Sequence, residues 1–120
     1  MSEAAAAVPR RRKRKTLSGR GRRQKGVKGE REVMKLFDET GFAVRGLEGL
    51  GDHIATKGKA GGLLAFHIEV KRQERVRVRE WLKQCRAETP EGMIPLVCFR
   101  ENGETWAAVL ALDDLLGLVS

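Results

Sequence analysis

The chain has 120 residues, of which 41% are hydrophobic and 5% aromatic, and its formal net charge is +8. This length suits one domain with a mainly aliphatic core and argues against two. No apolar run approaches the length of a membrane span. The two cysteines, Cys85 and Cys98, are too few for a disulfide scaffold, so we expect reduced, partly buried thiols.

The positive charge is concentrated at the start of the chain. Residues 1–28 contain 11 Lys and Arg and one acid, whereas residues 29–120 contain 13 Lys and Arg and 15 acids. Residues 1–25 have almost no large apolar side chains, so we expect a disordered basic arm ahead of a folded domain at residues 26–120. Three glycines are expected to prevent a helix in this region: Gly19, Gly21 and Gly26.

The basic arm favours sequence-independent attraction to phosphates, with a solubility or nuclear-import-like tail as the alternative. Its basic run follows a short Ala-rich stretch, whereas a secretory signal places charge before its apolar segment. We therefore expect an intracellular, cytoplasmic protein. The candidate phosphate-binding residues of this region are Arg10, Arg11, Arg12, Lys13, Arg14, Lys15, Lys25 and Lys28.

The first predicted element after the arm is a helix from Gly29 to Thr40, which ends before Gly41. Val33, Leu36 and Phe37 are spaced to form one apolar stripe along it. Most of its charged residues are expected to lie on other faces.

Three strands are predicted next. The first two, Phe42–Arg45 and Asp52–Ala55, are short and flank the glycine-rich loop Gly46–Gly51. A glycine-containing turn at Lys57–Gly62 leads into Leu63–Lys71, the strongest strand pattern in the chain.

The second half of the chain predicts a helix at Val76–Ala87 and a buried strand at Ile94–Phe99. Asn102-Gly103 is a hairpin signal that precedes a strand at Thr105–Leu110. A short helix at Ala111–Leu118 follows. The whole order, α-β-β-β-α-β-β-α, predicts an α/β fold with a mixed sheet flanked by helices.

The candidate site lies at the end of the long strand. Glu69 and Lys71 share one face of that strand, whereas Val70 points to the opposite face and the core. Asp52 begins the preceding strand, 17 residues before Glu69, so a hairpin between the two strands can bring both carboxylates together. Neighbouring carboxylates repel unless a cation lies between them, and hard oxygen ligands suit Mg²⁺ or Mn²⁺.

A phosphodiester needs the chemistry that such a group offers, since a divalent ion polarises the phosphoryl oxygen and helps to form hydroxide from water. Lys71 is a candidate to hold that water, to donate to the phosphate or to act as a base. Glu30, near the start of the first helix, is a fourth candidate that can ligate the metal directly or through water. Glu32 lies nearly opposite on the helix and is not expected to share this role. The alternative is an ordinary cross-strand salt bridge.

These residues resemble a known family. Lys25-Gly26-Val27-Lys28-Gly29-Glu30-Arg31-Glu32 runs into a helix, and Gly41–Arg45, Gly51-Asp52 and Ile68-Glu69-Val70-Lys71 follow. The pattern resembles the PD-(D/E)XK nuclease superfamily and, within it, the archaeal-type Holliday junction resolvases. The resemblance covers Lys25 to Arg72 and rests beyond that on element order. Gly51 stands in place of the usual proline, and the loop before it is short and not strongly basic.

The resemblance implies a restriction-endonuclease-like core, a Mg²⁺ site and a homodimer that acts on branched DNA in recombination and repair. It implies catalytic roles for Glu30, Asp52, Glu69 and Lys71, and a further metal ligand in the main-chain carbonyl of Val70. Mn²⁺ is expected to substitute for Mg²⁺.

Further contacts with DNA are expected from the basic stretch after the motif, through Arg72, Arg75 and Arg77, and from Gln84 on the second helix. An ordinary charged helix face is the alternative. Neither histidine, His53 nor His67, is expected to act directly, although His67 shares a face with Glu69.

The sequence therefore predicts a Mg²⁺-dependent endonuclease of branched DNA, of the Holliday junction resolvase kind. Another structure-specific or nicking nuclease of the same superfamily is the nearer alternative. A non-catalytic nucleic-acid-binding module is the alternative from another class, and the complete set of two acids and a lysine argues against it.

Overall fold

The computed structural model describes residues 19–46, 53–72 and 75–120, and the side chains of its first helix from Gly26 onward. The elements in chain order are α1 (Gly19–Glu39), β1 (Ala43–Arg45), β2 (His53–Lys59), β3 (Gly62–Lys71), α2 (Val78–Glu88), β4 (Ile94–Phe99), β5 (Ala107–Val109) and α3 (Leu112–Val119). The predicted element order is confirmed. None of the helices in these described ranges is long and apolar enough to cross a membrane.

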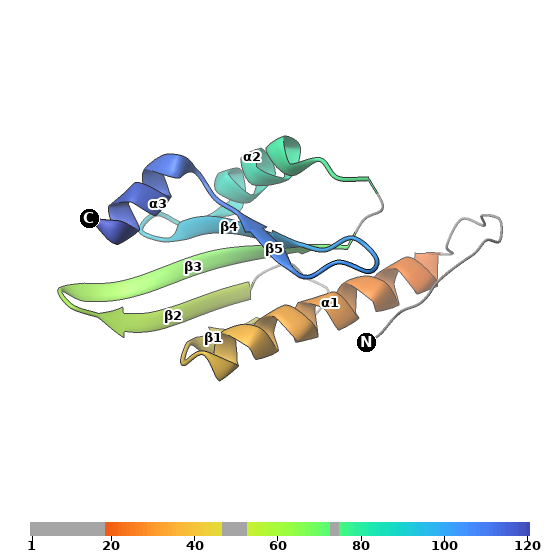
Figure 1. Cartoon of the computed structure of the whole chain (residues 1–120), viewed down its shortest axis with the longest axis horizontal. Helices are drawn as coiled ribbons and strands as arrows, with labels where there is room; N and C mark the ends of the chain where they lie inside the picture. Colours follow the sequence, from red (N-terminus) through yellow and green to blue (C-terminus); the bar gives the residue numbers. More distant parts are fainter. Residues whose placement is uncertain (1–18, 47–52, 73–74) are drawn as a thin grey trace.

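The sheet has five strands in the order β1-β2-β3-β4-β5. Only β3 and β4 are parallel, and α2 forms the crossover that a parallel pair requires. The helix α1 packs along one face of the sheet and α2 along the other (Figure 1). The prediction of a mixed sheet flanked by helices is thereby confirmed.

The first helix begins ten residues earlier than predicted. The prediction placed its start at Gly29 and a helix-free arm before Gly26, but α1 begins at Gly19. Glycine costs about 1 kcal/mol relative to alanine within a helix, and the arginine, lysine and glutamine between these glycines are good helix formers. Residues 1–18 of the expected arm, with Arg10–Lys15, lie outside the described residues.

The β2–β3 hairpin is also longer than predicted. The expected turn at Lys57–Gly62 is wrong, because β2 continues to Lys59 and pairs it with Gly62. The turn is reduced to Ala60 and Gly61, and the positive φ of Gly61, +85°, is a conformation that glycine adopts without a steric penalty. Tertiary pairing therefore extends the strand through residues with weak strand propensity.

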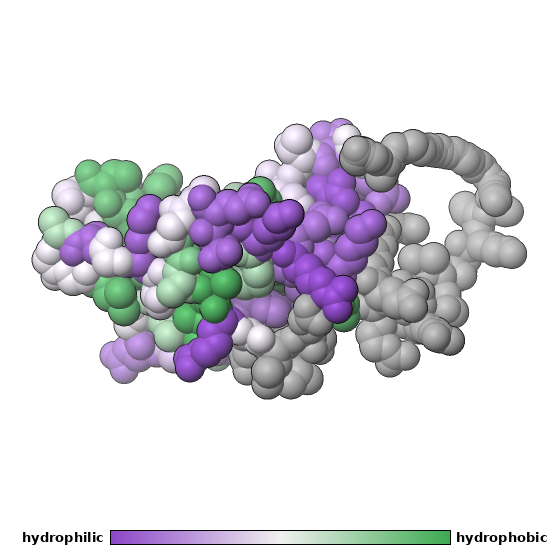
Figure 2. All heavy atoms as spheres, turned by 90° about the horizontal axis from the view of Figure 1, so that it is seen from below, coloured by the Kyte–Doolittle hydropathy of each residue, from purple (hydrophilic) through white to green (hydrophobic). Residues whose placement is uncertain are grey.

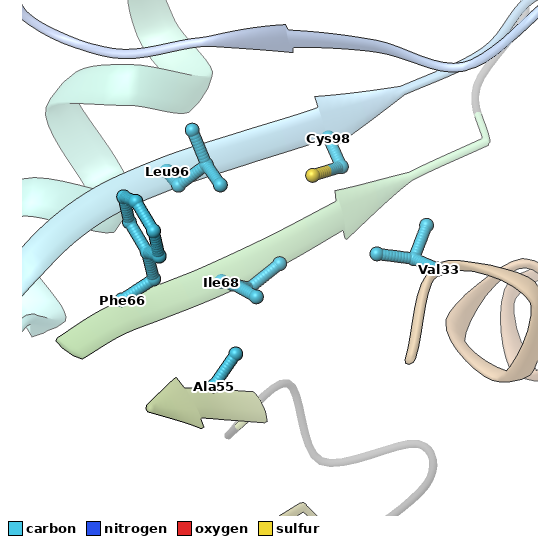
Figure 3. Close-up of a cluster of buried hydrophobic side chains, with 6 residues drawn as sticks. All are labelled: Val33, Ala55, Phe66, Ile68, Leu96 and Cys98. Carbon is cyan, nitrogen blue, oxygen red and sulfur yellow. The ribbon is translucent and has the colours of Figure 1, made fainter. Parts of the chain in front are cut away.

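The core lies on both faces of the sheet. On the α1 side, six buried residues form one cluster: Val33, Ala55, Phe66, Ile68, Leu96 and Cys98. Figure 3 shows these six side chains, which come from α1, β2, β3 and β4. On the α2 side, Trp81 and Cys85 pack against Val97. The long strand β3 is thus covered from both faces.

The predicted apolar stripe of α1 is wrong at Leu36. Leu36 is 48% exposed, whereas Val33 is buried and Met34 and Phe37 pack against the α1-side cluster. The helix is rotated so that residues 33, 34 and 37 face the sheet. Figure 2 views the molecule from below, where hydrophilic side chains are prominent along the α1 side.

Replacing Gly26 or Gly29 of α1 by alanine is expected to have opposite effects on the stability of the fold. A Cβ at Gly26 meets nothing within 4 Å, so Gly26→Ala should stabilise the fold by up to about 1 kcal/mol. A Cβ at Gly29 would lie 2.8 Å from Arg72 Cγ and 3.2 Å from Trp106. Arg72 is anchored by hydrogen bonds to the Arg100 carbonyl and to Asn102. Gly29→Ala should therefore destabilise the fold by about 1–3 kcal/mol.

Urea denaturation of the two variants beside the wild type measures this difference. Equal stability of Gly26→Ala and Gly29→Ala would contradict the close approach of α1 to Arg72.

Both cysteines are buried, so we expect their thiols to be unreactive in the folded protein. Cys85 is 0% and Cys98 5% exposed. Burial raises the pKa of the Cys98 thiol to about 12 and also raises the pKa of the Cys85 thiol. Because the thiolate is the reactive form, a disulfide-exchange reagent at pH 8 should label neither thiol in native buffer and both in urea. Rapid labelling of either thiol in native buffer would contradict the packing.

Candidate active site

Glu69 and Lys71 lie on the α2 side of β3, as the period of two predicts. His67, on the same face, contacts Cys85 of α2, whereas Ile68 lies in the α1-side cluster. Lys71 Nζ is 3.7 Å from Glu69 Oε2, and both side chains are 16% exposed. The strand therefore presents a carboxylate and an ammonium group together, close to its C-terminal end and largely shielded from water.

The environment of Glu69 disfavours its charged form. Desolvation by burial is the largest influence and raises the pKa of this carboxyl above its ordinary 4.5, and Glu88 also raises it. Lys71 and His67 lower the pKa but do not cancel the effect of burial. A further positive charge beside Glu69 would favour the carboxylate.

Asp52 lies outside the described residues, so its place beside Glu69 stays a prediction. The described residue next to it, His53, pairs with Ile68, which is next to Glu69. Val70 packs against the α1-side cluster, as predicted. The role of its main-chain carbonyl as a metal ligand is a prediction too.

Glu30 approaches the sheet from the α1 side. Its Oε2 atom is 3.5 Å from Nε2 of His53, a residue that is only 2% exposed. His53 is opposite Ile68 in the hairpin, and residues opposite each other in an antiparallel pair point to the same face. Glu30 and His53 therefore meet on the α1 side, whereas Glu69 and Lys71 project on the α2 side.

Sequence reasoning missed the contact between His53 and Glu30. The two residues are distant in the sequence, and only the packing of α1 over β2 brings them together. One signal was present, because the strand alternation that turns Asp52 toward one face turns His53 toward the other.

Glu32 has a structural role, in agreement with its exclusion from the predicted site. It accepts a 3.0 Å hydrogen bond from Trp106 Nε1, and Arg100 lies 3.7 Å from the same oxygen. These contacts tie α1 to the segment around β5. Trp106 also packs against the α1-side cluster.

His67 and Trp81 are core residues. His67 Nδ1 lies 3.1 Å from Thr89 Oγ1, and this hydroxyl donates to the Cys85 carbonyl. The hydroxyl can therefore accept from Nδ1–H of His67. Trp81 is 5% exposed and packs between α2 and β4.

The candidate DNA-binding residues divide into three groups. Lys28, Arg75, Arg77 and Gln84 are exposed. Arg72 instead donates to the Arg100 carbonyl at 2.6 Å and to Asn102 Oδ1 at 3.0 Å, so it joins the end of β3 to the β4–β5 turn. The side chain of Lys25 and residues Arg10–Lys15 lie outside what the structure describes.

Of the predicted metal-binding side chains, Glu30 and Glu69 are described and Asp52 is not. The described ranges contain no group of three or more His, Cys, Asp and Glu side chains around one point. Comparison of the sequence with family models and with curated proteins finds no match. The case for a site therefore rests on the residues themselves.

The burial of Glu69 predicts that its removal stabilises the fold in the absence of metal. A carboxyl whose pKa is raised on folding adds most stability when it is protonated, and stability falls as the pH rises through the folded pKa. Glu69→Gln should therefore raise the melting temperature at pH 7 in EDTA by a few degrees. The gain should shrink toward pH 4, where wild-type Glu69 is also neutral.

Thermal denaturation at several pH values measures this effect, with the exposed Glu91→Gln as the matched control. A lower melting temperature of Glu69→Gln at pH 7 would mean that its ion pair with Lys71 outweighs its burial.

Proposed function

We propose that this protein is a Mg²⁺-dependent endonuclease of branched DNA, of the Holliday junction resolvase kind, with a restriction-endonuclease-like core. The observation that carries the proposal is the half-buried Glu69–Lys71 pair near the end of a central strand. An exposed salt bridge would contribute little and need no burial. Here both side chains are largely shielded from water, and burial raises the pKa of the Glu69 carboxyl.

The residues present fit a hard divalent cation. Glu69 supplies a carboxylate whose burial is not compensated by Lys71 alone. The β2–β3 register ends with His53 opposite Ile68, so its continuation by one residue would bring Asp52 opposite Glu69. Two carboxylates and the Val70 carbonyl would offer the oxygen donors that Mg²⁺ prefers.

A bound Mg²⁺ would polarise the phosphoryl oxygen and lower the pKa of a bound water. Protein residues would position the cation and the reacting groups. Asp52 and Glu69 would hold and orient the cation, and Lys71 Nζ would donate to the phosphate or to the attacking water. Glu30 lies on the α1 side of the sheet, across from Glu69 and Lys71, and is given no step in this chemistry.

Affinity would come mainly from the basic residues of the arm and from the exposed Lys28, Arg75 and Arg77. Contacts of this kind recognise backbone charge and shape rather than base sequence. A homodimer and an intracellular, cytoplasmic location complete the proposal. Two copies of the site would allow symmetric cutting of two strands, and sedimentation measures the oligomer.

The test is cleavage of a labelled four-way junction by the purified full chain with Mg²⁺ or Mn²⁺. Asp52→Asn, Glu69→Gln and Lys71→Ala should each lower the rate by at least about 100-fold, because each removes a group that acts in the transition state. Glu91→Gln, an exposed charge change, should leave the rate unchanged.

No cleavage by the wild type with either metal, or full activity in Asp52→Asn and Glu69→Gln, would refute the proposal. A duplex of the same sequence separates a junction enzyme from a duplex-cutting or nicking one. Tight DNA binding without cleavage would favour the non-catalytic module.

A further inference from the structure

The α1 side of the sheet holds a buried polar group that the proposed chemistry leaves unexplained. His53 is 2% exposed, and neither of its ring nitrogens has a hydrogen-bond partner among the described residues. A buried polar group without a partner costs about 1–3 kcal/mol. The imidazole is therefore expected to have a partner that is not part of the described chain.

The distance from His53 to Glu30 suits two ligands of one metal ion better than a hydrogen bond. His53 Nε2 and Glu30 Oε2 are 3.5 Å apart. An N–H···O hydrogen bond is typically about 2.9 Å long. By contrast, two ligand atoms that each lie about 2.1 Å from a tetrahedral ion are about 3.4 Å from one another.

There is room for the rest of a coordination shell. His53 and Glu30 line a pocket of about 390 Å³, together with Arg31, Met34, Val44, Arg45 and Gly46. A water molecule occupies about 30 Å³ in the liquid, so the pocket can hold several. The side chain of Glu30 is 12% exposed, which places the pair at the inner end of an open pocket rather than in a sealed core.

We propose that His53 Nε2 and the Glu30 carboxylate are two protein ligands of a Zn²⁺-type ion on the α1 side of the sheet. Imidazole nitrogen suits Zn²⁺ and related transition metals, whereas Mg²⁺ prefers oxygen. Water or an anion fills the remaining positions. Two arginines, Arg31 and Arg45, also line the pocket, and positive charge near it favours an anion such as a phosphate oxygen.

This site goes beyond the proposed nuclease function and does not depend on it. The sequence predicted Glu30 as part of the catalytic group, but the structure places it with His53 on the side of the sheet opposite to Glu69 and Lys71. A protein that cuts no DNA would still bind the ion here.

The experiment is a Zn²⁺ titration of the full chain after chelator treatment, in competition with a chromophoric chelator. We expect one saturable ion that depends on the α1-side pair. His53→Asn and Glu30→Gln should each weaken its binding at least tenfold, because each removes one of two protein ligands. Glu91→Gln, which removes an exposed carboxylate outside both groups of proposed ligands, is the matched control and should bind within twofold of the wild type.

Unchanged Zn²⁺ binding in His53→Asn, no saturable binding by the wild type, or loss of binding in Glu69→Gln alone would overturn the assignment.

If His53→Asn does not fold, the wild type still provides a test. The chain has two histidines, and nitrogen-detected NMR should show a Zn²⁺-dependent shift of the His53 imidazole and little change in His67. A shift of neither imidazole would refute the site. Junction cleavage, measured separately, bears only on the nuclease proposal.

Discussion

The alternation of side chains along β3, between two packed faces, is the constraint on which the rest of the structure depends. Phe66 and Ile68 face α1, and His67, Glu69 and Lys71 face α2. The register with β2 and β4 transmits this alternation to both neighbours, since Ile68 is opposite His53 on one side and Leu96 on the other. A slip by one residue would turn Glu69 into the α1-side cluster and Ile68 away from it.

This constraint divides the polar groups into two sets. Glu69 and Lys71 share one face, whereas Glu30 reaches the opposite face and meets His53. Both sets contain a group whose burial is unfavourable: a carboxyl with a raised pKa and an imidazole without a hydrogen bond among the described residues. Buried groups of this kind are frequent at sites that bind charged ligands, because the ligand supplies the missing interaction.

The helix α1 shows how tertiary contacts override local preference. Four glycines lie within it, yet the helix runs for 21 residues. Its inner part is held by Val33 against the sheet and by Glu32, which bonds to Trp106. Gly29 has a further role, because the absence of a side chain lets the helix approach Arg72 and Trp106. A glycine that appears to interrupt a helix in the sequence is here the residue that permits its packing.

The sequence by itself determined the element order, the mixed sheet and the shared face of Glu69 and Lys71. Those features follow from local periodicity, which a chain carries in the spacing of its apolar residues. The tertiary structure alone decided the start of α1, the extension of β2 to Lys59, the exposure of Leu36 and the pairing of Glu30 with His53. Each of these depends on contacts between segments distant in the sequence, whose free energies outweigh propensity and leave no periodic signal. Local pattern therefore predicts the Glu69–Lys71 pair, whereas only the packing of α1 over β2 reveals the Glu30–His53 pair.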